Sequence, residues 1–306
     1  MNFAHLHVVL NHVPSIGSVV GAALFIASLV RKSDLLKKIS LAVLVVVALA
    51  ALPTYLSGNA AQLILRNRSE IPKGVIEAHQ NSAMLTLIFL TITGALSWFG
   101  LWQFRRFSRP GSWNSSAVLI FSIATSVLIL RTANIGGDIS HPEIRVDQGT
   151  TIAENIGWRY PIERFSNDQA WVWPASETLH FVGMALLFGV TLLLTLRMLG
   201  MMKSIPFAAV HRLLPLGMLG FVINVISGMV FFIASPGMYI SNPGFTAKIV
   251  FILLAASCVI YFTIFEGPWR VGADKEAPLS AKIVAVSTMV SLLGVMYFGR
   301  MLPFFR

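Results

Sequence analysis

Long apolar stretches alternate with short polar segments from one end of the chain to the other. A helix of about 20 apolar residues is long enough to cross the hydrocarbon core of a bilayer. We expect such helices at residues 14–30, 39–57, 79–104, 116–135, 172–196, 213–234, 244–265 and 283–305. The pattern therefore predicts an all-α, polytopic membrane protein with eight transmembrane helices that form two four-helix bundles.

The composition agrees with this fold class and excludes several functions. Hydrophobic residues make up 56% of the chain and charged residues only 12%, and the mean hydropathy is +0.74. The net charge is +10, but the basic residues lie in short loops and form no aromatic-interleaved patch for a nucleic acid. Cys258 is the only cysteine, which excludes a disulfide framework and a thiolate zinc site. No CxxCH motif occurs, so any haem would be held without a covalent link.

The basic residues also predict an orientation in the membrane. They gather in alternate loops, within residues 31–38, 105–109, 197–212 and 270–282. The positive-inside rule places these loops in the cytoplasm. We therefore expect a multi-pass protein of the bacterial cytoplasmic (inner) membrane, with both termini on the periplasmic side.

The longest polar segment divides the predicted helices into two sets. We expect an N-terminal four-helix membrane domain at residues 1–145 and a periplasmic connecting loop at 146–170. A C-terminal four-helix membrane domain is expected at 171–306. The lipid bilayer is then the first partner of both domains.

Histidines are the main candidates for chemistry. An imidazole inside an apolar slab is costly unless it is hydrogen-bonded or ligates a metal. Histidines on neighbouring helices can supply the axial ligands of a haem iron. We predict that one or two haem b groups are ligated near the periplasmic face by His12, His79, His141 and His180, with His7 as a substitute. The alternative is that these side chains are interfacial and hydrogen-bond to water or lipid headgroups.

Two arginines near the end of the fourth predicted span could assist such a site. Arg131 still lies in the apolar run, where an unpaired guanidinium is expensive, and Arg145 follows in the polar segment after it. We expect these two residues to neutralise haem propionates or to position a quinone, which is the second cofactor we consider. The alternative for Arg131 is a side chain that snorkels to the interface and caps its helix.

Short motifs in the first half of the chain carry a resemblance. They are HLHVVLNHVPSIG at 5–17, LPTYLSG at 52–58, IEAH at 76–79, NIGG at 134–137 and HPEIR at 141–145. With these motifs, residues 1–145 resemble an uncharacterised family of bacterial four-helix membrane proteins. The resemblance implies a haem-binding role, which is supposed for that family from its histidines.

The second half carries a different set of motifs. They are ETLHFVG at 177–183, LRMLG at 196–200, LP at 214–215, SG at 227–228 and NPGFTAK at 242–248. With them, residues 171–306 resemble the four-helix membrane domains of copper-resistance D and cytochrome b561-like proteins. A dihaem cytochrome b561 has histidine pairs on both sides of the membrane. This half lacks that arrangement, which argues against electron transfer through two stacked haems.

Together these features predict a membrane-embedded b-type cytochrome subunit. It would carry electrons between a quinone and a periplasmic redox protein. We expect it to act as an electron-transfer subunit of an oxidoreductase complex rather than as an enzyme alone. One alternative is a cofactor-free anchor or scaffold for the other subunits of a larger complex. Another is a copper or small-solute transporter, which would need a continuous polar route through spans whose cytoplasmic halves are mostly apolar.

Overall fold

The structure is a computed structural model that describes residues 3–65, 72–140, 159–240 and 242–305. The secondary structure of these residues is helical and contains no strand. Eight helical segments within them are long and apolar enough to cross a membrane. The predicted fold class, an all-α polytopic membrane protein, is therefore confirmed.

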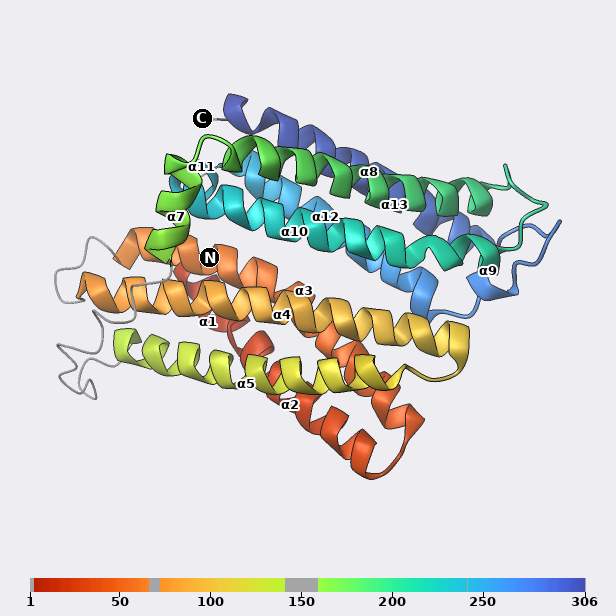
Figure 1. The fold of residues 1–306 in the computed structure, drawn as a ribbon, viewed down its shortest axis with the longest axis horizontal. Coiled ribbons are helices and arrows are strands. Elements are labelled where there is room, and N and C mark those ends of the chain that lie inside the picture. Colours follow the sequence, from red (N-terminus) through yellow and green to blue (C-terminus); the bar gives the residue numbers. More distant parts are fainter. Residues whose placement is uncertain (1–2, 66–71, 141–158, 241, 306) are drawn as a thin grey trace. The chain divides into compact units, whose positions relative to one another are not determined.

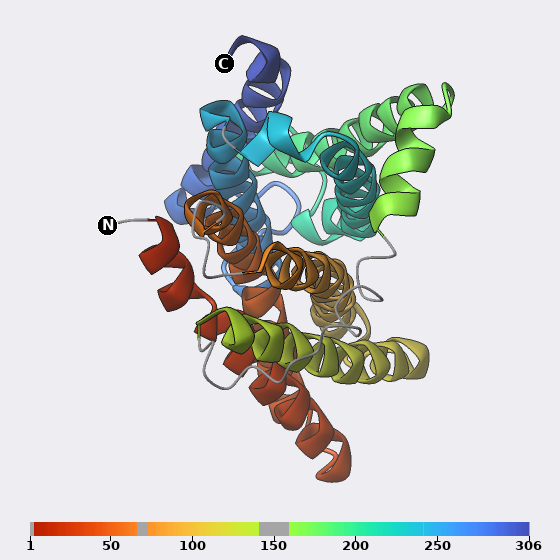
Figure 2. The ribbon, with the colours of Figure 1, turned by 90° about the vertical axis from the view of Figure 1, so that its left-hand side faces the viewer.

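The chain divides into two compact units, Met1–Arg164 and Phe165–Arg306, and their boundary lies inside the predicted connecting segment. Part of that segment forms a helix that we did not predict, α7 (Arg159–Asp168). The first unit contains α1 (Phe3–Leu10), α2 (His12–Val30), α3 (Asp34–Leu65), α4 (Lys73–Phe107) and α5 (Ser112–Ser140) (Figure 1). Helix α3 packs against α1, α2 and α4, while α5 packs against α2 and α4 and closes the bundle (Figure 2).

The second unit is built from four long helices and several short ones. They are α8 (Val172–Leu199), α9 (Phe207–Val210), η2 (His211–Leu213), α10 (Leu214–Ala234), α11 (Pro236–Ile240), α12 (Pro243–Ile264), η3 (Pro268–Arg270), α13 (Leu279–Met301) and η4 (Leu302–Phe304). Helix α8 packs against α10 and α13, and α12 packs against α13. The α12 helix begins at a well-made cap, because the side chain of Asn242 accepts hydrogen bonds from the backbone of Gly244 and Phe245.

Many large apolar side chains lie on the outside of the helices, and many small polar ones are buried between them. Val46 and Ile226 are each 62% exposed, whereas Thr93 and Thr125 are buried and their hydroxyls lie 2.9 Å apart between α4 and α5. In water this arrangement would be unfavourable, but a lipid surround accepts the apolar side chains. Small residues and hydroxyl hydrogen bonds are the usual contacts between helices in membranes.

Helices α8 and α10 come into backbone contact at a pair of glycines. A Cβ atom placed on Gly220 would lie 2.5 Å from the carbonyl oxygen of Gly183, and one placed on Gly183 would lie 2.8 Å from that of Gly220. Neither position has room for a side chain unless the two helices move apart. The pair therefore fixes how closely α8 and α10 approach.

We expect Gly220→Ala to destabilise the second unit by about 1–3 kcal/mol, because the added methyl group meets backbone atoms that cannot yield locally. The matched control is Gly189→Ala on α8, where a Cβ atom would meet nothing within 4 Å. That change should be neutral or slightly stabilising, since alanine is the better helix former. Thermal unfolding of both variants in detergent measures the difference, and equal midpoints would contradict the close contact.

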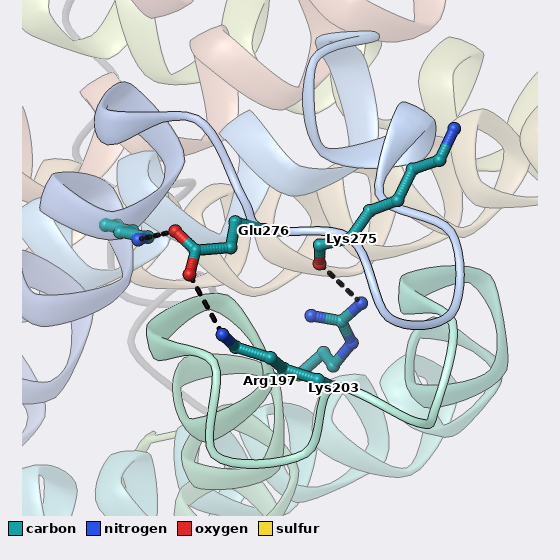
Figure 3. A network of polar contacts seen from close by, with 5 residues as sticks. Arg197, Lys203, Lys275 and Glu276 are labelled. Atoms are coloured by element: carbon teal, nitrogen blue, oxygen red, sulfur yellow. Dashed lines mark hydrogen bonds and ion pairs between the residues drawn. The ribbon is translucent and has the colours of Figure 1, made fainter.

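One buried arginine ties together the connections at one end of the second unit. Arg197, in the last turn of α8, is fully buried. Its Nε donates to the carbonyl of Ile205, and its Nη2 donates to the carbonyls of Gly272 at 2.7 Å and Lys275 at 3.3 Å. Figure 3 shows the guanidinium pointing to the Lys275 carbonyl. One side chain thus hydrogen-bonds to both the segment after α8 and the segment before α13.

An exposed ion-pair cluster lies next to this arginine. Glu276 pairs with Lys203 at 2.9 Å and with Lys282 at 3.2 Å (Figure 3). The hydrogen bond from Lys203, followed by that from Lys282, holds the pKa of Glu276 below its ordinary value. Because these groups are exposed to solvent, salt screens the cluster and it adds little to stability. Arg197 is the stronger link between the two connections.

Candidate functional site

Two imidazoles of the first unit lie close together. The ring centroids of His7 on α1 and His79 on α4 are 6.5 Å apart, and the ring planes are nearly perpendicular, at 80°. The two helices bring them together because α1 and α4 both pack against α3. Of the histidines predicted to ligate haem iron, His79 therefore lies beside His7, which was predicted as a substitute ligand.

The imidazole of His7 is fixed by α3. Its Nδ1 lies 3.0 Å from the carbonyl oxygen of Thr54 and 3.3 Å from the hydroxyl of Ser57. A Cβ atom on Gly58 would lie 2.8 Å from Cε1 of His7, so the ring reaches this position only because residue 58 is glycine.

The imidazole of His79 is fixed by α5 in the same manner. Its Nδ1 lies 3.1 Å from the carbonyl oxygen of Thr132, and a Cβ atom on Gly136 would lie 3.1 Å from Cε1 of the ring. Each histidine thus uses a threonine carbonyl and a glycine one helical turn further along the neighbouring helix. The sequence signal is a Thr-x-x-x-Gly pattern that occurs at 54–58 and again at 132–136.

These hydrogen bonds define the protonation of both rings. A carbonyl oxygen can only accept, so Nδ1 of each imidazole carries the proton and Nε2 keeps its lone pair. Metal-ligating histidines are usually held in this way, with one ring nitrogen bonded to a carbonyl and the other left for the metal.

The spacing of the rings also suits a shared metal. A metal–imidazole bond of about 2 Å puts a metal about 3 Å from each ring centre, so the centres of two opposed ligands stand about 6 Å apart. The observed separation is 6.5 Å. The donor chemistry and the ring separation of this pair are therefore compatible with a metal group bound by both imidazoles.

The other predicted ligands lie elsewhere. His12 is exposed, and its Nδ1 bonds to the carbonyl of Val8 at 2.9 Å, one turn back along the chain. The geometry favours His7 over His12 as the counterpart of His79. His141 lies outside the described residues.

His180 belongs to the second unit and is described within it. Its Nδ1 lies 2.8 Å from the hydroxyl of Ser227 on α10, and its ring is 5.6 Å from that of Phe231. A Cβ atom on Gly228 would lie 3.8 Å from Cε1 of the ring. In the same unit, His211 is fully buried and its ring lies 4.4 Å from that of Trp269.

Of the two predicted arginines, only one can be placed. Arg131 is exposed on α5, one residue before the threonine whose carbonyl holds His79. Arg145 lies outside the described residues.

Protein ligands for a bare metal ion are not grouped in the described ranges. No cluster of three or more histidine, cysteine, aspartate or glutamate side chains is placed there to hold one. A metal group held by the histidine pair would therefore have to be one that needs only two protein ligands. No family model, curated protein or solved structure matches this chain.

Proposed function

We propose that the first unit is a b-type cytochrome domain in which His7 and His79 are the axial ligands of one haem. The observation that carries this proposal is the neighbouring pair of imidazoles, 6.5 Å apart, with both Nδ1 atoms bonded to backbone carbonyls. The arrangement leaves Nε2 of each ring for iron.

The number of ligands favours haem over a bare ion. A protein usually holds a zinc or copper ion with three or four side chains. In haem the macrocycle fills the equatorial positions of the iron, so the protein supplies only the axial ligands. Two histidines on separate helices are sufficient to bind haem iron. They are fewer ligands than a zinc or copper ion usually has.

The residues of this chain would tune and hold the group. The Thr54 and Thr132 carbonyls fix each imidazole in one tautomer and raise its basicity toward iron. The glycines at 58 and 136 let both rings lie directly against the neighbouring helices. Haem would supply reversible one-electron chemistry at this position.

The functional context follows the predicted orientation. His79 lies near the start of α4, at the end of the first unit opposite the basic connection after that helix. The positive-inside rule places this end at the periplasmic face of the inner membrane, with both termini on that side. We propose that the domain carries electrons between a quinone in the bilayer and a periplasmic redox protein. A second haem at His180 stays a prediction of the sequence.

An optical spectrum with metal analysis of the full chain, purified in mild detergent, tests the proposal. We expect a Soret band, sharp low-spin bands after reduction with dithionite, and haem b with matching iron content. Copper in place of iron would support the transporter alternative. A protein with neither group, isolated with other subunits, would support the scaffold alternative, and either result would overturn the haem proposal.

A further inference from the structure

A chain of side-chain amides crosses from α3 to α4 beside the histidine pair. Nε2 of Gln62 donates to Oε1 of Gln80 at 3.2 Å, and Nε2 of Gln80 donates to Oδ1 of Asn59 at 3.2 Å. Asn59 directly follows the glycine that contacts His7, and Gln80 directly follows His79. Two members of the amide chain are thus next in sequence to residues at the histidine pair, one on α3 and one on α4.

The amide at one end of this chain has an unused donor. Asn59 is only 3% exposed, and its Nδ2 is buried without a hydrogen-bond partner in the described part of the chain. Its Oδ1 is occupied by Gln80. A buried amide NH₂ without an acceptor is costly, and more so in an apolar surround. Such a donor indicates a place where an acceptor oxygen from another molecule binds.

Every side chain in this series is an uncharged amide, which limits the kind of molecule that Asn59 can bind. A neutral amide suits a neutral carbonyl oxygen, whereas phosphates and carboxylates are usually bound by arginine or lysine. A quinone carbonyl is a neutral acceptor of this kind.

We infer that Asn59, supported by Gln80 and Gln62, binds a carbonyl oxygen of a quinone next to the histidine pair. This inference rests on the proposed function, since it assigns the place where the quinone meets the electron-carrying site. The sequence suggested Arg131 and Arg145 for positioning the quinone. The amide chain is a different set of residues, in the interior of the first unit.

The test measures quinone affinity directly, with the full chain in detergent. Decylubiquinone is titrated into the wild type, Asn59→Ala and Asn224→Ala, and binding is followed by calorimetry. Asn224 lies on α10 in the second unit and its Nδ2 bonds to a carbonyl of its own helix, so its variant is the matched control. We expect about tenfold weaker binding for Asn59→Ala, the loss of one buried hydrogen bond, and no change for the control. Gln80→Ala, which keeps Asn59 but removes its support, should weaken binding severalfold.

The outcomes separate this inference from the proposed function. Haem in the wild type with equal quinone affinity in Asn59→Ala would overturn the inference alone. Quinone binding that depends on Asn59 in a protein without haem would support the inference and overturn the haem proposal. Loss of haem in Asn59→Ala with quinone affinity retained would show that the amide holds a propionate, and would also overturn the inference. If Asn59→Ala does not fold, Gln80→Ala decides between the same outcomes.

Discussion

His79→Ala should abolish the low-spin haem spectrum of the purified protein. The change removes one of the two proposed ligands and leaves only the imidazole of His7. Replacing only the groups around a metal ligand usually lowers affinity about 10- to 100-fold, so loss of the ligand itself should exceed that. Haem content per chain and the reduced spectrum are measured after identical expression and purification.

The same experiment on the neighbouring histidines identifies the second ligand. His7→Ala should also lose the low-spin bands, leaving at most a weakly bound, high-spin haem. His12→Ala is the matched control and should keep the wild-type spectrum, because its ring is exposed and bonds to its own turn of the chain. A spectrum that is lost in His12→Ala and kept in His7→Ala would contradict the pairing described here.

Arg197→Met should be the most destabilising single change in the second unit. It leaves the carbonyls of Ile205, Gly272 and Lys275 without their charged donor in a buried position. Hydrogen bonds to charged groups are worth about 1.5–3 kcal/mol each, and this change removes all three of them. Thermal or denaturant unfolding in detergent measures the effect.

Two further variants give this measurement its reference points. Arg212→Met removes an exposed arginine and should leave the unfolding midpoint unchanged. Arg197→Lys keeps the charge but cannot reach three carbonyls at once, so it should fall between the wild type and Arg197→Met. Equal stability of Arg197→Met and Arg212→Met would show that Arg197 does not hold the two connections together.

The number of membrane-crossing helices was predictable because it depends only on length and apolarity. The helix ends were not. The span expected at 79–104 lies within α4, Lys73–Phe107, because polar residues continue a helix beyond the hydrocarbon core. Hydropathy detects only the apolar middle. This is also why the amide chain was missed, since Asn59 and Gln62 follow the end expected for the second span at 57.

The candidate site was predicted in part, for a reason that lies in helix geometry. Hydropathy identified histidines at the outer ends of the spans. It did not show on which side of its helix each histidine lies. His7 lies on α1, whereas His12 begins α2. Only His7 hydrogen-bonds to α3, because the ring of His12 bonds back to Val8. The repeated Thr-x-x-x-Gly pattern was the signal that distinguishes His7, because each copy seats one imidazole.

The shortness of α1 has a consequence for assembly. Phe3–Leu10 is an eight-residue helix, and a helix of that length has little stability of its own in the absence of packing partners. A group bound by both His7 and His79 would join α1 to α4, in addition to the packing of α1 against α3.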